Sequence, residues 1–208
     1  LDTKNSEILE DIEREALADN VPIIRREMQS FLKVLLMVKK PMRVLEVGTA
    51  VGFSALLMSE YVPEECAITT IENYEKRIPI ARQNFVRAGK EKKITLLEGD
   101  AMDVLKTLEG PYDFIFMDAA KGQYIHYLPE ILRLLAKGGI LVSDNVMQDG
   151  DVIESRFAVE RRDRTIHARM REYLYELKHN DALVTSIIPL GDGVALSVKK
   201  EVGTDIAQ

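Results

Sequence analysis

Cysteine is almost absent from this sequence, and long apolar runs are absent altogether. Cys66 is the only cysteine in 208 residues, which excludes an intrachain disulfide and is typical of a reducing cytoplasm. It enters the apolar run Ala67-Ile68, so we interpret it as a buried structural thiol rather than a nucleophile. No apolar stretch is long enough to span a membrane and none has the pattern of a signal peptide. We therefore expect a cytoplasmic protein without a membrane partner.

Positive charge is scarce as well. The formal net charge is −6, so a nucleic-acid partner would have to bind at a local basic patch. Hydrophobic residues make up 46% and charged residues 30% of the chain, which is ordinary for a globular protein. A chain of 208 residues is long enough to bury a sizeable core, and we expect one domain over residues 1–208.

Hydrophobic periodicity predicts an alternation of helices and strands. Two N-terminal helices are expected within residues 1–40, near 3–18 and 21–38. Strands are expected at 42–47, 67–72, 93–97, 112–117 and 139–143, with helices at 51–61, 74–88, 101–108 and 123–134. A charged helix near 156–178 precedes two β-rich runs, Leu183–Ile188 and Val194–Val198, which are joined by a short link that contains Gly191 and Gly193.

This order of elements predicts an α/β fold. Strands that alternate with helices of this length form right-handed crossovers and a mostly parallel sheet. The last two strands have the spacing of a hairpin, which predicts an antiparallel edge. We therefore expect a central, mostly parallel sheet of seven strands with an antiparallel C-terminal hairpin and helices on both faces.

Glu46 precedes a turn that contains Gly48 and Gly52. Ligands of open α/β sheets bind at the carboxyl ends of the strands, and glycine lets the backbone approach them closely. The spacing is G-x-x-x-G, not the G-x-G-x-x-G of dinucleotide turns, which favours an amino-acid-bearing nucleoside over a pyrophosphate. Ser54, in the first turn of the next helix, is a candidate to bind the ligand's carboxylate. The alternative is that both glycines only separate a strand from a helix.

Two further strand ends carry acidic residues. Glu72 lies twenty residues after Gly52, where an acidic side chain can accept hydrogen bonds from both hydroxyls of a ribose. Asp100, in Gly99-Asp100-Ala101, is a candidate acceptor for an adenine amino group. The alternative interpretations are a surface glutamate that starts a helix and an aspartate that caps one.

These strand ends together resemble the class I S-adenosylmethionine-dependent methyltransferases, from about residue 20 to the end of the chain. Lys137-Gly138-Gly139-Ile140-Leu141 is similar to the glycine turn that these enzymes carry before their fifth strand. The resemblance implies a Rossmann-like fold and S-adenosylmethionine as the cofactor. The cofactor-binding residues that it implies are Ile23, Glu46, Gly48, Ser54, Glu72, Gly99, Asp100, Ala101 and Asp118.

Oxygen-bearing side chains follow the fourth and fifth strands. Asp118 ends the fourth strand, and Asp144 and Asn145 end the fifth. Because neighbouring parallel strands end at the same edge of a sheet, we expect these three side chains to lie close together. Two carboxylates and an amide oxygen suit a hard divalent ion such as Mg²⁺ that keeps open positions for water or substrate. Without a cation, two adjacent carboxylates would repel each other and the pKa of one would rise.

Asp118-x-x-Lys121 with Asp144-Asn145 resembles the metal and catalytic signature of the catechol O-methyltransferase-like branch. The resemblance implies that Asp118, Asp144 and Asn145 are the metal ligands and that Lys121 is the general base. Asp118 is expected to serve catalysis and cofactor binding as well. The metal would chelate two vicinal oxygens of the substrate and lower the pKa of the hydroxyl that receives the methyl group. The family also implies a homodimer, and the two N-terminal helices are candidates for its contacts.

Catechols, caffeoyl groups and 5-hydroxyuridine all offer vicinal oxygens. A basic segment favours the RNA base, because arginine suits phosphate recognition. The segment comprises Arg156, Arg161, Arg162, Arg164, His167, Arg169 and Arg171. Val21-Pro22-Ile23 and Pro189–Gly193 are also similar to the bacterial tRNA 5-hydroxyuridine methyltransferases, which modify the wobble base of the anticodon loop. We therefore expect tRNA as the substrate, with a small catechol-like molecule as the alternative. Ion pairs along the helix would also explain several of the arginines.

Two other classes of function compete with a methyltransferase. A nucleotide-dependent oxidoreductase would need the G-x-G-x-x-G turn that is missing here. A non-catalytic RNA-binding module would need neither Lys121 nor the three candidate metal ligands. Both are therefore the weaker interpretations.

Overall fold

The computed structural model describes residues 4–147 and 164–201. The chain divides into two compact units, residues 1–104 and 105–208. One domain over residues 1–208 therefore stays a prediction. Within the described residues, no helix is long and apolar enough to cross a membrane.

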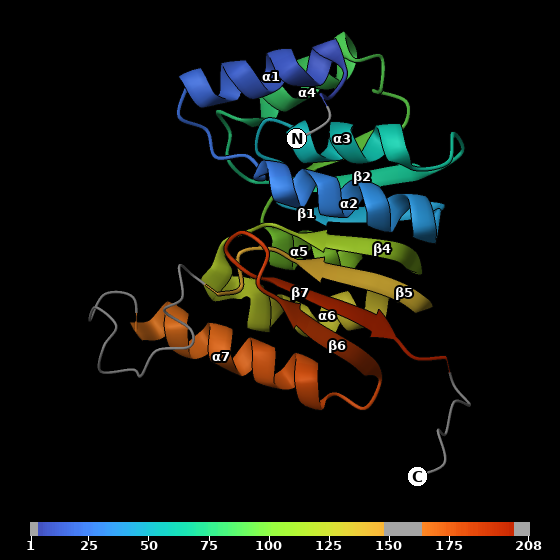
Figure 1. The fold of residues 1–208 in the computed structure, drawn as a ribbon, viewed down its shortest axis with the longest axis vertical. Helices are drawn as coiled ribbons and strands as arrows, with labels where there is room; N and C mark the ends of the chain where they lie inside the picture. Colours follow the sequence, from blue (N-terminus) through green and yellow to red (C-terminus); the bar gives the residue numbers. More distant parts are fainter. Residues whose placement is uncertain (1–3, 148–163, 202–208) are drawn as a thin grey trace. The chain divides into compact units, whose positions relative to one another are not determined.

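The first unit contains three parallel strands, β1 (Arg43–Val47), β2 (Ala67–Glu72) and β3 (Ile94–Glu98), in the order β3-β2-β1. Its helices are α1 (Glu7–Ala18), α2 (Arg26–Lys39), α3 (Phe53–Tyr61), α4 (Ile78–Arg87) and α5 (Ala101–Thr107), the last of which ends in the second unit. Helix α3 is buried from Phe53 to Ser59 and packs against α1, α2 and α4, which lie beside these strands in Figure 1. This apolar helix forms the centre of the first unit.

The second N-terminal helix begins at Arg26, not near residue 21 as its periodicity predicts. Asn20 adopts a left-handed conformation with φ 54° and ends α1, and the amide of Val21 donates to the carbonyl of Ala16 at 2.8 Å. This is a Schellman ending, in which asparagine is tolerated. Pro22 then keeps Val21 extended. The segment between α1 and α2 is therefore a connection and not a helical turn.

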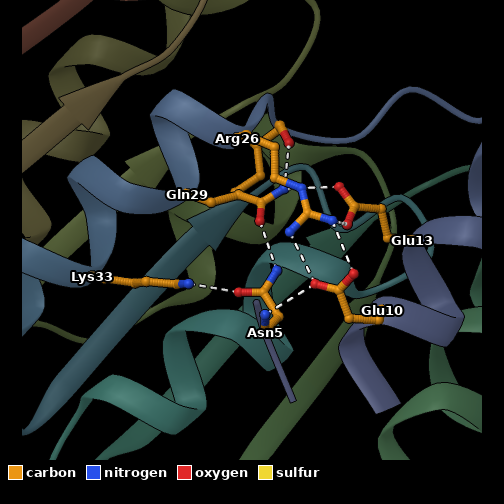
Figure 2. Close-up of polar contacts among 7 residues, drawn as sticks. Asn5, Glu10, Glu13, Arg26, Gln29 and Lys33 are labelled. Carbon is orange, nitrogen blue, oxygen red and sulfur yellow. Dashed lines mark hydrogen bonds and ion pairs between the residues drawn. The ribbon is translucent and has the colours of Figure 1, made fainter. Parts of the chain in front are cut away.

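Polar side chains join α1 to α2. We call Asn5, Glu10, Glu13, Arg26, Gln29 and Lys33 the N-terminal polar cluster, shown in Figure 2. Arg26 donates to both carboxylate oxygens of Glu10, at 2.9 and 3.1 Å, and also pairs with Glu13. Gln29 donates to Glu13 at 3.1 Å and to the carbonyl of Ile24 at 3.0 Å. The cluster fixes the connection between the two helices.

The second unit contains β4 (Tyr112–Met117), β5 (Leu135–Ser143), β6 (Leu183–Ile188) and β7 (Val194–Lys199). Strand β5 pairs in parallel with β4 and antiparallel with β7, which in turn pairs antiparallel with β6. A short 3-10 helix, η1 (Lys121–Gln123), leads into α6 (Tyr124–Leu134), and α7 (Arg164–His179) precedes β6. Helix α7 packs against α6 and β6 (Figure 1). The residues expected to be helical at 156–163 lie outside the described residues.

The glycine turn expected before the fifth strand lies inside that strand. Strand β5 begins at Leu135, and its pairing with β4 is irregular between Leu135 and Ile140. Gly138 there has a φ of 68°, and a Cβ on Gly139 would lie 2.7 Å from the carbonyl oxygen of Ala136. The two glycines thus lie in an irregular part of β5, between its first paired residue and the regular pairing that starts at Ile140.

The seven strands follow the order β3-β2-β1-β4-β5-β7-β6. The predicted seven-stranded sheet, mostly parallel with an antiparallel C-terminal hairpin and with helices around it, is confirmed.

Candidate functional site

The turn after β1 depends on its glycines. Gly48 has a φ of 104° and Gly52 a φ of 85°, and both values lie in the region that favours glycine. The amides of Gly48 and Thr49 both donate to the carbonyl of Ile71 at 3.1 Å, which binds the turn to the end of β2. A Cβ on Gly52 would lie 2.5 Å from the ring of Phe85. The turn is therefore fixed against β2 and α4, with the backbone of a glycine at each end.

Glu46 and Ser54 meet each other. The Glu46 side chain is fully buried and accepts hydrogen bonds from the hydroxyls of Ser54 and Thr70. Thr70 also bonds to Thr49 at 2.5 Å. A buried carboxylate needs such donors, so this network fixes the start of α3 to β1 and β2. The predicted contacts of Glu46 and Ser54 with a cofactor stay predictions.

Glu72 lies at the end of β2 and faces the glycine turn. Its carboxylate accepts from the backbone amides of Ala50 at 2.7 Å, Asn73 at 3.0 Å and Tyr74 at 2.8 Å. Ala50 has a φ of 47°, so the turn presents this amide through a conformation that is rare for alanine. The geometry brings together the glycine turn and the predicted ribose-binding residue.

The end of β3 adjoins the end of β2. The amide of Gly99 donates to the carbonyl of Glu72 at 2.9 Å. Asp100 is exposed and accepts from the amide of Met102 at 2.9 Å, as an aspartate that caps α5 does. Ala101 is the first residue of α5. Ile23, expected in a helix, lies half-buried in the connection before α2.

The candidate metal ligands meet in the second unit. Asp118 follows β4 directly, and Asp144 and Asn145 follow β5. The side-chain nitrogen of Asn145 lies 3.3 Å from Oδ1 of Asp118, and the amide of Asn145 donates to Oδ1 of Asp144 at 2.7 Å. Asn145 has a φ of 58°, a backbone conformation that asparagine tolerates better than most residues. The prediction that these three residues lie together is confirmed.

The charges at this site are not balanced. Burial, followed by the negative charge of Asp118, raises the pKa of Asp144 to about 7. Burial also raises the pKa of Asp118, against the opposing effects of Asn145 and Lys121. No group of three or more His, Cys, Asp or Glu residues that could hold a metal occurs in residues 4–147 and 164–201. The donor set here is two carboxylates and an amide oxygen, which fits a hard divalent ion with open positions.

Lys121 lies on η1 and has an acidic partner that the sequence did not indicate. Its Nζ lies 3.0 Å from Oδ2 of Asp192, a side chain only 8% exposed. Asp192 lies in the link between β6 and β7, and the sequence assigned no role to this aspartate. The negative charge of Asp192 also contributes to the raised pKa of Asp144. A further carboxylate thus lies beside Lys121.

The basic segment is only partly visible. Arg156, Arg161 and Arg162 lie outside the described residues, and Arg164 begins α7. Among the others, His167 is buried, Arg171 is exposed and Arg169 donates to the carbonyl of Gly122 at 3.2 Å. Arg169 therefore binds the loop that carries Lys121, which is a structural use of its guanidinium.

Comparison with known proteins identifies a family and several relatives. A family model described as O-methyltransferase matches residues 2–200. A catechol O-methyltransferase of Niastella koreensis is 35% identical over 60% of this chain and 58% of its own length. Caffeoyl-CoA O-methyltransferase 2 of Populus trichocarpa is 33% identical over 80% of this chain and 70% of its own length. The chain thus spans less than two thirds of the first of these relatives.

A solved structure has the same fold. The O-methyltransferase from Bacillus cereus, in complex with SAH, superposes with a TM-score of 0.85 at 26% identity, over 96% of this chain and 93% of that one. The prediction of an S-adenosylmethionine-dependent O-methyltransferase agrees with the family, the relatives and this structure. The chain belongs to the O-methyltransferase family.

Proposed function

We propose that this protein transfers the methyl group of S-adenosylmethionine to one hydroxyl of a small molecule with two vicinal oxygens, of the catechol or caffeoyl type. The observation that carries the proposal is the cluster of Asp118, Asp144 and Asn145 with Lys121 nearby. The names of the two relatives, which act on catechol and on caffeoyl-CoA, support this substrate class.

Asp118, Asp144 and Asn145 would hold a divalent cation such as Mg²⁺. When bound, such a cation lowers the pKa of a coordinated hydroxyl and orients it for transfer. Lys121 accepts the proton from that hydroxyl when its amine is uncharged, and Asp192, at 3.0 Å, stabilises the ammonium that results. Asp118 is proposed to serve metal binding, catalysis and cofactor binding.

In the first unit, the proposed cofactor-binding residues surround the glycine turn. The open backbone at Gly48 lets the cofactor approach, and Glu72 accepts from its ribose hydroxyls while it holds the amide of Ala50. Asp100, which is exposed at the start of α5, accepts from the adenine amino group. Ile23 and Ala101 add apolar contacts, and Glu46, Ser54 and Gly99 shape the surroundings.

A tRNA substrate is the second candidate, because α7 follows the metal-site residues and its start is rich in arginine. It has less support than the small molecule, because the names of the relatives point to catechol and caffeoyl substrates and Arg169 is already bonded to Gly122. The arginines at 156–162 would have to supply the phosphate contacts.

We further propose that the protein forms a homodimer through α2. The outward side of this helix presents Val34, Met37 and Val38, which are 60%, 60% and 78% exposed and lie at helical spacing. Apolar side chains gathered on one helix face favour burial against a second copy. Light scattering of the wild type and of a Met37→Lys/Val38→Lys variant tests this, and equal masses at the monomer value would contradict it.

The proposed function is tested with purified protein, S-adenosylmethionine and Mg²⁺, offered either caffeoyl and catechol substrates or tRNA that carries 5-hydroxyuridine. Mass spectrometry should detect a methyl ether on the small molecule and none on the tRNA nucleosides. Each reaction should stop in excess chelator. Methylation of tRNA without methylation of any catechol would replace this proposal by the RNA one, and full activity in chelator would exclude the metal.

A further inference from the structure

The link between β6 and β7 is bound by its backbone to the segment that follows the candidate metal ligands. The amide of Val146 donates to the carbonyl of Gly193, and the amide of Met147 donates to the carbonyl of Asp192, both at 2.9 Å. A Cβ on Gly193 would lie only 2.1 Å from Cγ of Met147. This approach requires glycine, so the position of Asp192 relative to Asn145 is fixed by the backbone.

The carboxylate of Asp192 is buried and holds Lys121. Asp192 is 8% exposed, and its Oδ2 lies 3.0 Å from Nζ of a lysine 71 residues earlier in the chain. The lysine's own loop is fixed as well, because Arg169 donates to the carbonyl of Gly122 and the amide of Gln123 to that of Ala120. Both ends of this ion pair therefore lie on anchored backbone.

The positive charge of Lys121 also interacts with two other carboxylates. Its positive charge lowers the pKa values of both Asp118 and Asp144, in opposition to burial. Its Nζ nevertheless donates a hydrogen bond to Oδ2 of Asp192 at 3.0 Å. Without that partner, an ammonium on a flexible four-carbon side chain would move to the pair of unbalanced carboxylates.

We propose that Asp192 is a positioning residue that holds the Lys121 ammonium away from Asp118 and Asp144 and so leaves these two carboxylates to a divalent cation. The inference rests on the proposed function, since it assigns the cation to those carboxylates and the proton transfer to Lys121. Asp192 acts through Lys121 and contacts neither substrate nor cofactor.

Binding of Mn²⁺, followed by electron paramagnetic resonance, tests the proposal without reference to turnover. Asp192→Asn should weaken Mn²⁺ binding about tenfold or more, the effect typical of a lost outer partner of a metal site. In the same variant kcat should fall while KM for the acceptor changes little. Asp192→Glu, which keeps the charge, should restore most of both. Asp181→Asn, an exposed aspartate before β6, is the matched control and should behave as the wild type.

A double variant separates positioning from a loss of structure. In Asp192→Asn/Lys121→Met the competing ammonium is gone, so Mn²⁺ should bind as in the wild type although turnover stays lost. Wild-type Mn²⁺ binding in Asp192→Asn, or no recovery in the double variant, would overturn the inference. Absence of Mn²⁺ binding and of cation dependence in the wild type would instead overturn the proposed function.

Discussion

Two acidic clusters in this protein treat their carboxylates in opposite ways. In the N-terminal polar cluster, Glu10 and Glu13 share Arg26, and hydrogen bonds to Arg26 and Asn5 lower the pKa of Glu10 to about 2. In the second unit, burial and then the negative charge of Asp118 raise the pKa of Asp144 to about 7. In the N-terminal polar cluster the carboxylates are paired with a cation, whereas the negative charge of Asp118 and Asp144 is only partly balanced.

The difference separates a structural role from a binding role. A cluster whose carboxylates are already paired with a cation stabilises the fold, and binding a further ion would not stabilise it more. In the second cluster burial raises the pKa values of both Asp118 and Asp144, and the charge of Asp118 raises that of Asp144 further, so a bound cation would relieve an unfavourable interaction. Lys121 offsets only part of this effect, because its ammonium is hydrogen-bonded to Asp192. The contrast therefore predicts which acidic residues serve stability and which serve activity.

The largest effect is expected at the unbalanced cluster. Asp144→Ala removes a proposed metal ligand, so turnover should fall by roughly a thousandfold or more, since the cation both orients the acceptor and lowers its pKa. Binding of S-adenosylhomocysteine should stay within about threefold of the wild type, because the predicted cofactor residues around Gly48 and Glu72 are untouched. Single-turnover kinetics and calorimetry measure the two quantities. Near-normal turnover would contradict the metal role of Asp144.

Glu72 shares a feature with each cluster. Its carboxylate accepts hydrogen bonds from backbone amides, as a structural carboxylate does, and it also lies at a proposed binding site. Glu72→Ala should weaken S-adenosylhomocysteine binding by roughly 1–3 kcal/mol, the penalty for leaving polar partners without a bond. Glu72→Gln, which keeps two acceptor sites on one oxygen, should lose less. Calorimetry with NAD as a comparison ligand should show no binding to any of the three proteins. Tighter binding of NAD than of S-adenosylhomocysteine would contradict the cofactor assignment.

Substitutions in the N-terminal polar cluster should change the stability of the protein and not its turnover. Arg26→Met removes the shared cation and leaves the buried Glu13 without its ion pair, so the free energy of unfolding should fall by about 2 kcal/mol. Arg14→Met is the control, because its pair with Asp11 is exposed and should contribute about 0–0.5 kcal/mol. Urea unfolding measures both variants. A loss of kcat in folded Arg26→Met protein would show that the N-terminal polar cluster also serves catalysis.

The sequence indicated one of these clusters and not the other. Asp118, Asp144 and Asn145 follow consecutive strands, and parallel strands bring such residues together whatever the details of packing. The N-terminal polar cluster depends on how two helices pack, which periodicity alone does not determine. The contact between Asp192 and Lys121 forms only when the link between β6 and β7 packs against a segment that is distant in the chain. No local sequence pattern therefore predicts it.

Local signals also competed with periodicity. The start of α2 was misplaced because apolar spacing continued through a segment in which Asn20 and Pro22 end one helix and delay the next. Glu46 is predicted to bind the cofactor, and that contact stays a prediction; its hydrogen bond from Thr70 on the neighbouring strand is a further contact that the sequence did not indicate. Contacts between strands are set by register, which one strand's sequence does not contain.

The smallest expected effect is an opposite pH dependence of the two clusters. The pKa of Asp144 is raised from 3.8 to about 7, so the folded protein without a cation loses stability as pH rises through that window and carries the full penalty above pH 7. The pKa of Glu10 is lowered from 4.5 to about 2, so its contribution is present above pH 4.5 and is lost as pH falls toward 2.

Thermal unfolding between pH 4.5 and 8.5, with and without Mg²⁺, isolates the Asp144 part of this dependence, because Glu10 stays ionised throughout that range. If solvent relieves most of the repulsion and about 1 kcal/mol remains, Mg²⁺ should raise Tm by about 2–4 °C more at pH 8 than at pH 5. Asp144→Asn carries no titrating group at this position, so its Tm without Mg²⁺ should fall less with rising pH than that of the wild type. An Mg²⁺ effect of equal size at both pH values would mean that Asp118 and Asp144 are as well balanced as Glu10 and Glu13, and the contrast between the two clusters would fail.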